Sequence, residues 1–508
     1  MRTPLPLVSL LLLAPGALAS DWTVTPGQSI QTFIDIASPG DRVLVQPGTY
    51  LERIDFSGKD IEVIGVRGAA QTTLDGGFTG PVVRFSGGET SSARLAGLTV
   101  TRGSYVAGLG GGGVQCLGGA TPSIEDCLVR GNTGKYGGGI SGSPFVRRTS
   151  IVSNTSSLTH GGGVYGAPQM RYCVVASNRA TSADGGGIYV VNGDATIEDC
   201  VIVENGAVFA NSSGGGIYVD SSATVQVRHC VLAMNYATGG AFAGLGGGAY
   251  AEAGGSLIES CTVVENSLSG SSTQGAGLFG AFTVRNSIVR DNNGGPNISG
   301  AAQVTFSDVG GGFPDFGNVD VDPGFVDPTN RDWHLDHGSP LIDAGDPMLL
   351  DPDLSPSDIG AFHFRTLYTV ANTLATSWED PSWPEVSATL GGKQVLQVLG
   401  DASNAGQFFW TLGTTSGTSP GITLLGVSVP LNYDFYLIRT GRLPNSGTLS
   451  NSQGSLDAGG RTQTTFRLGP NPSATSAGLL LHHATLMGSS DPVTPVIVTQ
   501  PEPLQLVP

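Results

Sequence analysis

The sequence predicts an all-β protein in which a parallel β-helix precedes a small β-sandwich, and two alternating repeats are the main evidence. The first repeat is a glycine triplet followed by a branched apolar residue and usually an aromatic residue, as in GGGIY at 185–189. Successive copies are 26, 24, 24, 29, 32 and 29 residues apart. A period of 20–50 residues is typical of stacked supersecondary units. The copies begin at residues 111, 137, 161, 185, 214, 246 and 275.

The second repeat ends in asparagine, and its apolar positions predict a bend in the chain. A small residue stands five positions before each asparagine, and apolar residues stand three before and two after that small residue. The first apolar position has the wrong parity to share a face of one strand with the small residue, so a corner must lie between them. Asparagine suits a ladder at a tight turn, because it tolerates left-handed backbone and can bond stacked neighbours. The asparagines are Asn132, Asn154, Asn178, Asn205, Asn235, Asn266 and Asn292.

The composition of the repeats disfavours helices. The repeats are short, rich in β-branched residues and interrupted by glycine, and none holds a 10-residue amphipathic stretch. We therefore expect each repeat to form one rung of a coil. Near the N-terminus, Ser29 can cap a short amphipathic segment with Ile30, Phe33 and Ile34 on one face, which would cover the open end of the coil.

These repeats resemble the right-handed parallel β-helix (pectin-lyase-like) superfamily. The GGGIY and apolar-x-x-Asn signals are also similar to the repeats of bacterial polymorphic outer-membrane proteins, and GDRVLVQPGTY at 40–50 is similar to the first rung of many secreted bacterial proteins of this kind. The resemblance covers about residues 22–364. It implies a right-handed coil but no particular activity, because this fold carries lyases, hydrolases and adhesins.

Residues 1–19 have the features of a secretory signal: Arg2, an apolar run over 7–13 and the small-x-small site at 17–19. We expect an exported or cell-surface protein, with no transmembrane segment in the mature chain. The formal net charge of −17 argues against nucleic acid and anionic membrane surfaces as partners. It also disfavours polyanionic substrates unless metal ions intervene.

Five of the six cysteines occupy the small position of the second repeat, alternating with Thr149 and Ser287. This pattern predicts buried free thiols, since free cysteine behaves as a small hydrophobe. A disulfide between neighbouring rungs, such as Cys200 with Cys230, is the alternative. A zinc site is less favoured, because one residue per rung cannot surround a tetrahedral ion.

The remaining chain divides into three expected parts. The β-helix is predicted over 20–307 and an Asp-rich closing segment over 308–364, where Asp320, Asp322 and Asp327 are candidate calcium ligands. Turn formation by aspartate explains the same residues without a metal ion. Residues 366–508 show short alternating runs typical of a β-sandwich. This part is similar to C-terminal domains of exported planctomycete proteins, which implies sorting or anchoring.

Aromatic residues of the first repeat suggest a glycan-binding face. They have the opposite parity to their apolar neighbours, so they point outward if those neighbours fill the core. A flat aromatic stripe suits stacking against sugar rings, although the rings can also stack on one another and only stabilise the sheet. Together with the loops that precede the glycine triplets, this gives the candidate glycan-binding residues Tyr136, His160, Tyr189, Tyr218 and Tyr236.

The same loop side carries the only candidates for catalysis. A polysaccharide lyase needs a base and a cation near a uronate carboxylate, and Lys135, His160 and Arg179 could form a minimal set. The Asp-Asp and Gly-His-Gly patterns of pectin-type hydrolases are absent from the sequence. The function that we predict is therefore non-catalytic binding or structure, directed at a polysaccharide or cell-envelope component. A polysaccharide lyase or other carbohydrate-active enzyme is the alternative.

Overall fold

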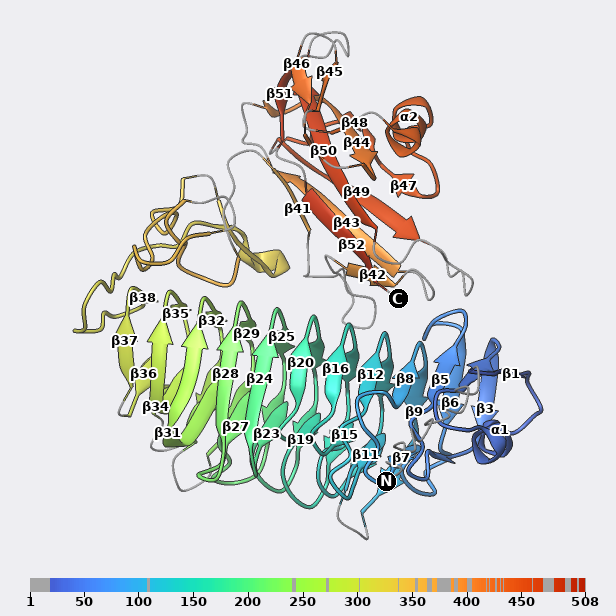
Figure 1. Ribbon diagram of the computed structural model, residues 1–508. Helices are drawn as coiled ribbons and strands as arrows, with labels where there is room; N and C mark the ends of the chain where they lie inside the picture. Colours follow the sequence, from blue (N-terminus) through green and yellow to red (C-terminus); the bar gives the residue numbers. More distant parts are fainter. Residues whose placement is uncertain are drawn as a thin grey trace, which may run out of the picture.

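In the computed structural model, the chain forms a parallel β-helix followed by smaller antiparallel sheets (Figure 1). The described residues are 19–351, except 107–109, 240–243, 271–273, 301 and 337, then 355–362, and interrupted stretches between 368 and 507. The predicted signal segment lies almost wholly outside them. No helix in this described part has the length and apolar character that a membrane-spanning helix requires.

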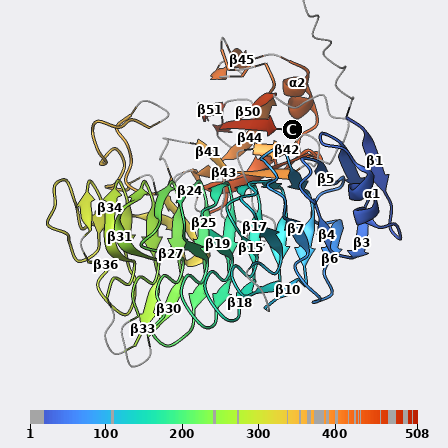
Figure 2. The same cartoon turned by 60° about the horizontal axis from the view of Figure 1, so that its bottom comes forward.

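Three parallel sheets form the coil; two extend from its first to its last rungs, and the third lies between residues 104 and 269. We call the 20-stranded sheet A, the 11-stranded sheet B and the 7-stranded sheet C. A typical rung passes through two short strands of A, one of B and one of C before the next glycine triplet. Figure 2 shows strands β10, β18, β30 and β33 of sheet C in a row.

The strands of sheet A are β1 (Asp21–Val24), β2 (Arg42–Val45), β4 (Ile54–Asp55), β5 (Glu62–Gly65), β7 (Val83–Phe85), β8 (Arg94–Ala96), β11 (Val114–Cys116), β12 (Ser123–Glu125), β15 (Ile140–Ser141), β16 (Phe145–Arg147), β19 (Val164–Gly166), β20 (Gln169–Arg171), β23 (Ile188–Val190), β24 (Asp194–Glu198), β27 (Ile217–Val219), β28 (Thr224–Arg228), β31 (Ala249–Glu259), β34 (Leu278–Arg285), β36 (Ile298–Ser299) and β37 (Gln303–Thr305).

Sheet B contains β3 (Gly48–Leu51), β6 (Thr72–Asp75), β9 (Thr99–Thr101), β13 (Leu128–Arg130), β17 (Ser150–Val152), β21 (Val174–Ala176), β25 (Val201–Val203), β29 (Val231–Ala233), β32 (Thr262–Val264), β35 (Ile288–Arg290) and β38 (Asp308–Val309). Sheet C contains β10 (Ser104–Tyr105), β14 (Thr133–Gly134), β18 (Thr155–Ser156), β22 (Arg179–Ala180), β26 (Gly206–Ala207), β30 (Tyr236–Thr238) and β33 (Ser267–Ser269).

The predicted corner between sheets A and B exists, and left-handed residues form it. The residue just before each small position has φ near +50°, as in Tyr172 (53°) and His229 (49°). A second left-handed residue makes the corner between sheets B and C, and it directly precedes the asparagine, as Met234 does (56°). The expectation that asparagine itself adopts left-handed backbone was therefore wrong. The turn is made one residue earlier, where the side chain points out of the coil.

The asparagines form the predicted ladder of hydrogen bonds. Asn205 is fully buried; its amide Nδ2 donates to the carbonyl of Val175 (2.8 Å) and to Oδ1 of Asn235 (2.9 Å). The same pattern recurs in neighbouring rungs, for instance from Asn178 to Asn205 (3.0 Å). The ladder satisfies buried backbone carbonyls that a turn would otherwise leave without donors.

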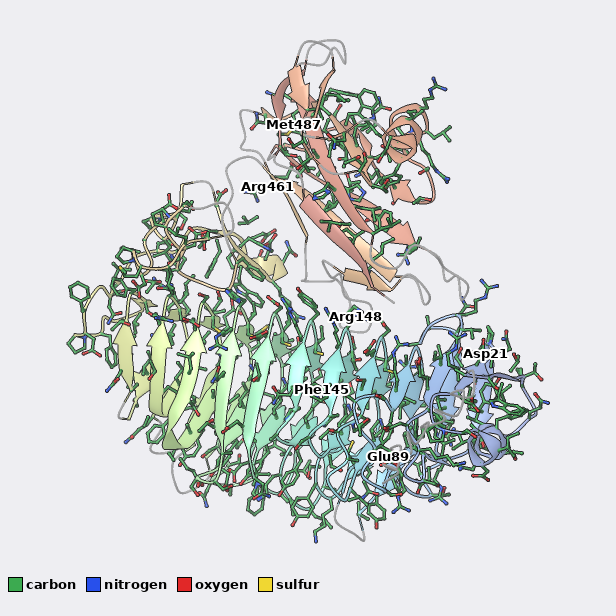
Figure 3. The ribbon with its side chains drawn as sticks, viewed as in Figure 1. Asp21, Glu89, Phe145, Arg148, Arg461 and Met487 are labelled. Carbon is green, nitrogen blue, oxygen red and sulfur yellow. The ribbon has the colours of Figure 1, made fainter. Side chains whose placement is uncertain are left out.

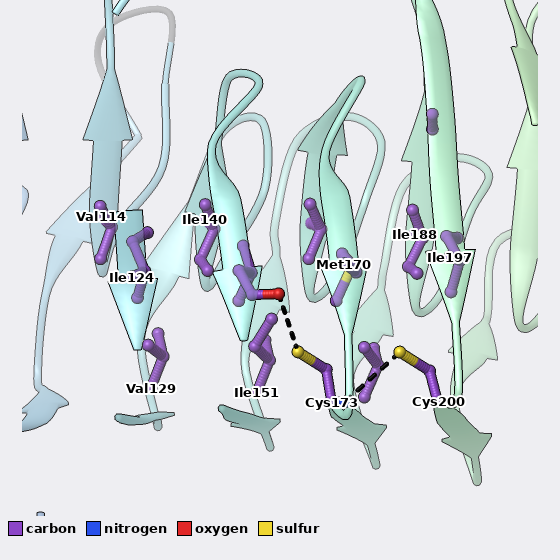
Figure 4. Packing of buried hydrophobic residues seen from close by; sticks show 14 of the residues in the cluster. Val114, Ile124, Val129, Ile140, Ile151, Met170, Cys173, Ile188, Ile197 and Cys200 are labelled. Carbon is purple, nitrogen blue, oxygen red and sulfur yellow. Dashed lines mark hydrogen bonds between the residues drawn. The ribbon is translucent and has the colours of Figure 1, made fainter. Parts of the chain in front are cut away.

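The inside of the coil is filled by columns of apolar side chains, one per rung (Figure 4). All six cysteines are buried and free, which confirms the prediction of unbridged thiols. Cys173 lies in this core, where its thiol donates to the carbonyl of Val146 (3.4 Å). Burial raises the pKa of the Cys127 thiol to about 12, so that this group stays protonated and inert.

The N-terminal end of the coil is covered as predicted. Helix α1 (Ile30–Ile36) is capped by Ser29, whose hydroxyl accepts from the N–H of Thr32, and it buries Ile30 and Ile34. A helix over the first rung protects a sheet end that would otherwise expose apolar core to water.

The closing segment folds back over the outer face of sheet B. That face is apolar, with Val174, Val201 and Val231 buried, and it packs in one cluster with residues of the closing segment. The segment contains strands β39 (Phe325–Asp327) and β40 (Asp332–Leu335) and the 3-10 helix η1 (Pro328–Asn330). Its residues in the cluster include Trp333, Leu335, Leu341, Ile359 and Ala361.

The C-terminal part is built as the predicted sandwich of two sheets. One consists of β41 (Tyr368–Ala371), β43 (Gly392–Leu399), β47 (Leu449–Ser450) and β49 (Arg461–Leu468). The other consists of β42 (Glu385–Ser387), β44 (Phe408–Thr414), β48 (Gln453–Ser455), β50 (Leu480–Gly488), β51 (Pro495–Val498) and β52 (Glu502–Val507).

The two sheets share a core in which Phe466 packs with Leu481 and Leu504. A hairpin of β45 (Ile422–Leu424) and β46 (Val427–Val429) and helix α2 (Phe435–Arg442) complete this part. Arg461 of β49 reaches the carbonyl of Val326 in the closing segment (3.2 Å; Figure 3).

Candidate functional site

Five aromatic rings form a continuous stack on the outer face of sheet A. Neighbouring rings are 4.7–5.5 Å apart between centroids, and Tyr189 and Tyr218 are nearly parallel, at 6°. The sheet register aligns them, because parallel pairing places each ring directly beside its equivalent in the next rung. This aromatic stack consists of Tyr165, Tyr189, Tyr218, Tyr250 and Phe279.

The ring faces in the middle of the stack are already occupied. Ile188 and Ile217 are fully buried inside the coil, which confirms that the tyrosines point outward. Yet Tyr189 and Tyr218 are only 6% and 7% exposed, since each lies between two other rings. Their faces are therefore not free to stack against a sugar ring. What they present outward is ring edges and hydroxyl groups.

Two carboxylates accept hydrogen bonds from these hydroxyls. Tyr189 donates to Asp220 (3.1 Å) and Tyr218 donates to Glu252, each acid belonging to the next rung. Burial raises the pKa of both tyrosines, and the adjacent carboxylates raise it further, so the phenols stay protonated donors. Burial alone would raise the pKa of Asp220, but hydrogen bonds from Ser222 and Tyr189 outweigh it and lower the value. The carboxylate of Asp220 is therefore fully ionised at neutral pH.

His160 and Asp184 form the flank of the stack. They directly precede the glycine triplets of successive rungs. The imidazole ring of His160 contacts the ring of Tyr189 in the next rung, with the two ring centroids 4.2 Å apart. Burial lowers the pKa of His160, although Asp220 and Glu252 oppose this effect, and Nδ1 lies 3.6 Å from Asp184. Burial raises the pKa of Asp184 to about 6. A hydrogen bond from the N–H of Ser213 (2.7 Å) lowers this pKa but does not outweigh the effect of burial.

Tyr136 extends the stack at its N-terminal end. Its ring lies 4.8 Å from Tyr165, and the ammonium group of Lys135 lies 5.3 Å from the Tyr136 centroid. Four of the five glycan-binding candidates, Tyr136, His160, Tyr189 and Tyr218, are thus brought together on one face.

Tyr236 and Arg179 lie elsewhere, in sheet C. Strands β22, β26 and β30 pair in order, which places Arg179, Gly206 and Tyr236 in one column. The ring of Tyr236 lies over Gly206, where an added Cβ would come within 2.2 Å of it. Arg179 therefore lies in sheet C, and Lys135 directly follows strand β14 of the same sheet, whereas the ring of His160 contacts Tyr189 in the aromatic stack.

Asp220 and Glu252 were not among the site residues predicted from the sequence. Each follows a stack tyrosine by two residues, in Tyr218-Val219-Asp220 and Tyr250-Ala251-Glu252, and therefore shares its face. This parity was available as a signal. The signal is weak, because only two rungs carry an acid at that position.

The three calcium candidates have turn-forming roles. Asp320 accepts from the N–H of Gly311 (3.2 Å), Asp322 from that of Gly324 (3.0 Å), and Asp327 caps η1. Across the described ranges, no three or more His, Cys, Asp and Glu side chains are grouped so as to hold a metal ion. The arrangement matches the alternative in which aspartate shapes turns.

Comparison with known proteins supports the class of fold. A family model described as a right-handed β-helix region matches residues 88–244, so these rungs are those of a right-handed parallel β-helix. No curated protein gives a significant sequence match. The further resemblances, to polymorphic outer-membrane repeats and planctomycete C-terminal domains, stay predictions.

Two solved structures illustrate what the chain is similar to. A rhamnogalacturonan lyase is 14% identical, with a TM-score of 0.39, over 68% of this chain and 97% of its own. A mannuronic acid-specific polysaccharide family 6 lyase from human gut microbiota is 12% identical, with a TM-score of 0.25, over 60% of this chain and 92% of its own. At these values neither similarity assigns an activity to this protein.

Proposed function

We propose that this protein binds a polysaccharide along the outer face of sheet A, without cleaving it. The observation that carries the proposal is the row of tyrosine hydroxyls and carboxylates beside the aromatic stack, repeated from rung to rung at Asp220 and Glu252. Carboxylates and phenols are good partners for sugar hydroxyl groups, and stacked rings hold them rigidly in place. Glycan contact occurs at ring edges and polar groups instead of ring faces.

The charges favour a neutral glycan over an anionic one. Within the described residues, Asp220 and Glu252 take part in no ion pair, and the one basic group near Asp184 is His160, whose pKa is lowered by burial. A uronate would meet three carboxylates without a compensating cation, which is unfavourable at close range. This supports binding of neutral polysaccharide and weighs against a lyase, which needs that cation.

Affinity electrophoresis on a polysaccharide panel tests the proposal. Neutral glucans, mannans and xylans should retard the full-length protein, whereas polygalacturonate and alginate should not. Asp220→Asn and Glu252→Gln should each weaken retention several-fold. Asp35→Asn on α1 removes the same charge at the N-terminal end of the coil and should leave retention unchanged. Retention by none of the neutral glycans, or equal retention of all variants, would contradict the proposal.

A second candidate function, hydrolysis of a glycosidic bond, is favoured by one specific observation. Asp184 and Asp220 flank the His160–Tyr189 contact, and their pKa values are moved in opposite directions, to about 6 for Asp184 and downward for Asp220. A protonated acid beside an ionised carboxylate is the pair that glycoside hydrolysis uses.

Product analysis distinguishes the candidates. Hydrolysis releases new reducing ends without ultraviolet-absorbing unsaturated products, and Asp184→Asn should abolish it while retention persists. A lyase would release unsaturated products from uronate polymers. Release of neither product, with retention intact, supports the non-catalytic proposal. Export, proposed from the signal-like residues 1–19, is tested by locating the full-length protein in a fractionated cell.

A further inference from the structure

The outer face of sheet C carries two basic side chains, Lys135 and Arg179. Arg179, in β22, is exposed, and Lys135 directly follows β14, two rungs earlier. Neither of them forms an ion pair with any residue that the structure describes. Figure 2 shows the strands of sheet C on the side of the coil away from the C-terminal part. This face is therefore separate from the aromatic stack and accessible to a partner.

Hydroxyl groups stand beside these basic side chains. Parallel pairing places Thr133, Thr155 and Arg179 next to one another in successive rungs. Their strand neighbours Ser156 and Ala180 are fully buried inside the coil, so the three side chains point outward. The hydroxyls of Thr133 and Thr155 are bonded to no other described residue. They remain available as donors to a ligand.

The charge of this face is opposite to that of the whole chain, whose formal net charge is −17. No acid stands at the outward positions of β14, β18 and β22. Glu204, at the corner of the next rung, is engaged by Arg331 and by the hydroxyl of Ser177 (2.9 Å). An anionic partner would therefore meet uncompensated positive charge here, whereas the acidic remainder of the surface would repel it.

An aromatic ring adjoins Arg179 on the same face. Tyr236 follows Gly206 in this column, and the hydroxyl end of its ring occupies the space that a side chain at position 206 would fill. The ring is half-buried, and no other ring among the described residues packs against it. Unlike the rings of the aromatic stack, it therefore keeps surface that a sugar can contact.

We propose that the outer face of sheet C binds a sulfated polysaccharide. A sugar ring packs on Tyr236, and its sulfate ester accepts hydrogen bonds from the guanidinium of Arg179 and the hydroxyl of Thr155. A second sulfate of the same glycan reaches Lys135, which lies two rungs, or about 10 Å, along the coil from Arg179. A sulfate ester has three terminal acceptor oxygens and a carboxylate only two, so sulfate better suits this group of guanidinium, ammonium and hydroxyl donors.

A heparin oligosaccharide and its desulfated, N-acetylated form test the proposal on the full chain. Both carry the same carboxylates, and they differ in sulfation. Calorimetric titration should show the sulfated form binding at least about tenfold more tightly. Nonspecific attraction cannot produce this result, because the protein has a formal net charge of −17. Polyphosphate supplies negative charge without a sugar ring and should bind several-fold more weakly than the sulfated oligosaccharide. Equal binding of the two oligosaccharides, equally tight binding of polyphosphate, or no binding of the sulfated form up to about 10 mM would overturn the proposal.

Variants then assign the binding to sheet C. Arg179→Gln should weaken the sulfated oligosaccharide about tenfold and Lys135→Gln several-fold, because each removes one cation. Tyr236→Thr should also weaken it several-fold; Thr155 stands at the equivalent position of an earlier rung, and thermal melting checks the fold. Arg67→Gln, in the turn after β5, removes an exposed cation away from this face and should bind normally. Unchanged affinity in Arg179→Gln would refute the assignment, as would an equal loss in Arg67→Gln.

Discussion

The asparagine ladder and the aromatic stack are both columns of one residue per rung, but they differ in regularity. Inside the coil, asparagine stands in the ladder from Asn132 to Asn292 without interruption, and each amide bonds the next. On the outer face, the stack begins at Tyr165, ends at Phe279 and is flanked by different residues in each rung.

This difference separates the demands of folding from those of binding. A position inside the coil meets the same neighbours in every rung, so one residue type serves throughout. A position outside is free to vary, and the polar groups His160, Asp184, Asp220 and Glu252 gather in only a few adjacent rungs. We therefore expect changes in the ladder to cost stability and changes beside the stack to alter recognition.

The largest loss of stability is expected from Asn205→Ala in the middle of the ladder. The change removes the bonds to Val175 and Asn235 and leaves the backbone N–H of Asn178 (3.0 Å in the intact protein) unpaired. Buried groups left unsatisfied cost about 1–3 kcal/mol each, so we expect a loss of about 3–5 kcal/mol in denaturant unfolding. The exposed variant Asn192→Gly should change stability by less than about 0.5 kcal/mol. Equal effects of the two changes would show that the ladder is dispensable.

Truncation of the stack should cost less. Tyr218→Ala opens a gap between Tyr189 and Tyr250, and we expect a loss of about 2–4 kcal/mol, somewhat below that for a fully buried aromatic residue. Tyr218→Phe keeps the ring and removes only the bond to Glu252, so about 1 kcal/mol is expected. Denaturant unfolding of both variants measures the comparison. A negligible loss for Tyr218→Ala would mean that the stack exists for binding and not for stability.

Asp184 should make stability depend on pH. Its folded-state pKa, about 6, exceeds the value of about 3.9 expected in the unfolded chain, so the folded state holds the proton more tightly. The resulting stabilisation is present below about pH 4 and is lost as the pH rises through about 6. Asp184→Asn keeps an acceptor for the N–H of Ser213 and should be more stable than the parent by about 1–2 kcal/mol at pH 8, after allowance for solvent screening. Unfolding at pH 4 should show no such gain; a pH-independent difference would rule out the titration of Asp184 as its cause.

The smallest effect is expected in the thiol column. Cys230→Ser places a hydroxyl where Thr149 and Ser287 already stand in other rungs, and the carbonyl of Arg228 (3.0 Å from the thiol) can accept its hydrogen. We expect a change of less than about 1 kcal/mol. Thiol titration of the unfolded, never-reduced parent should find its cysteines free, whereas complete oxidation would contradict the buried free column.

Periodicity predicted the coil well, because each rung must bury the same columns. Periodicity placed the left-handed turn at each asparagine, one residue too late. Rung geometry imposes left-handed backbone on whatever residue stands at a corner, including Tyr172 and Met234. Residue type therefore carries little information there. Helix α2 was also missed, since its eight residues follow only a single cap, Asp434.

The candidate site was predicted in part. Tyr189 and Tyr218 were found through their shared phase, and the structure adds that their faces are occupied. Arg179 and Tyr236 were predicted on the same side of the coil, but they lie in sheet C and not in the aromatic stack of sheet A, and their roles stay predictions. Only the three-dimensional path around the rung separates those two surfaces.

The closing segment affects how a mechanical load is distributed over the rungs and how cooperatively they unfold. In a solenoid each rung touches only its neighbours, so a break at one end can spread rung by rung. Here the closing segment is bonded to several rungs: Arg331 pairs with Glu204, the hydroxyl of Thr262 accepts from the N–H of Ala361 (3.0 Å), and the carbonyl of Asn286 accepts from the N–H of Gly360 (2.8 Å). Tension applied beyond residue 362 would therefore load several rungs at once in shear, and would not peel the last rung away alone.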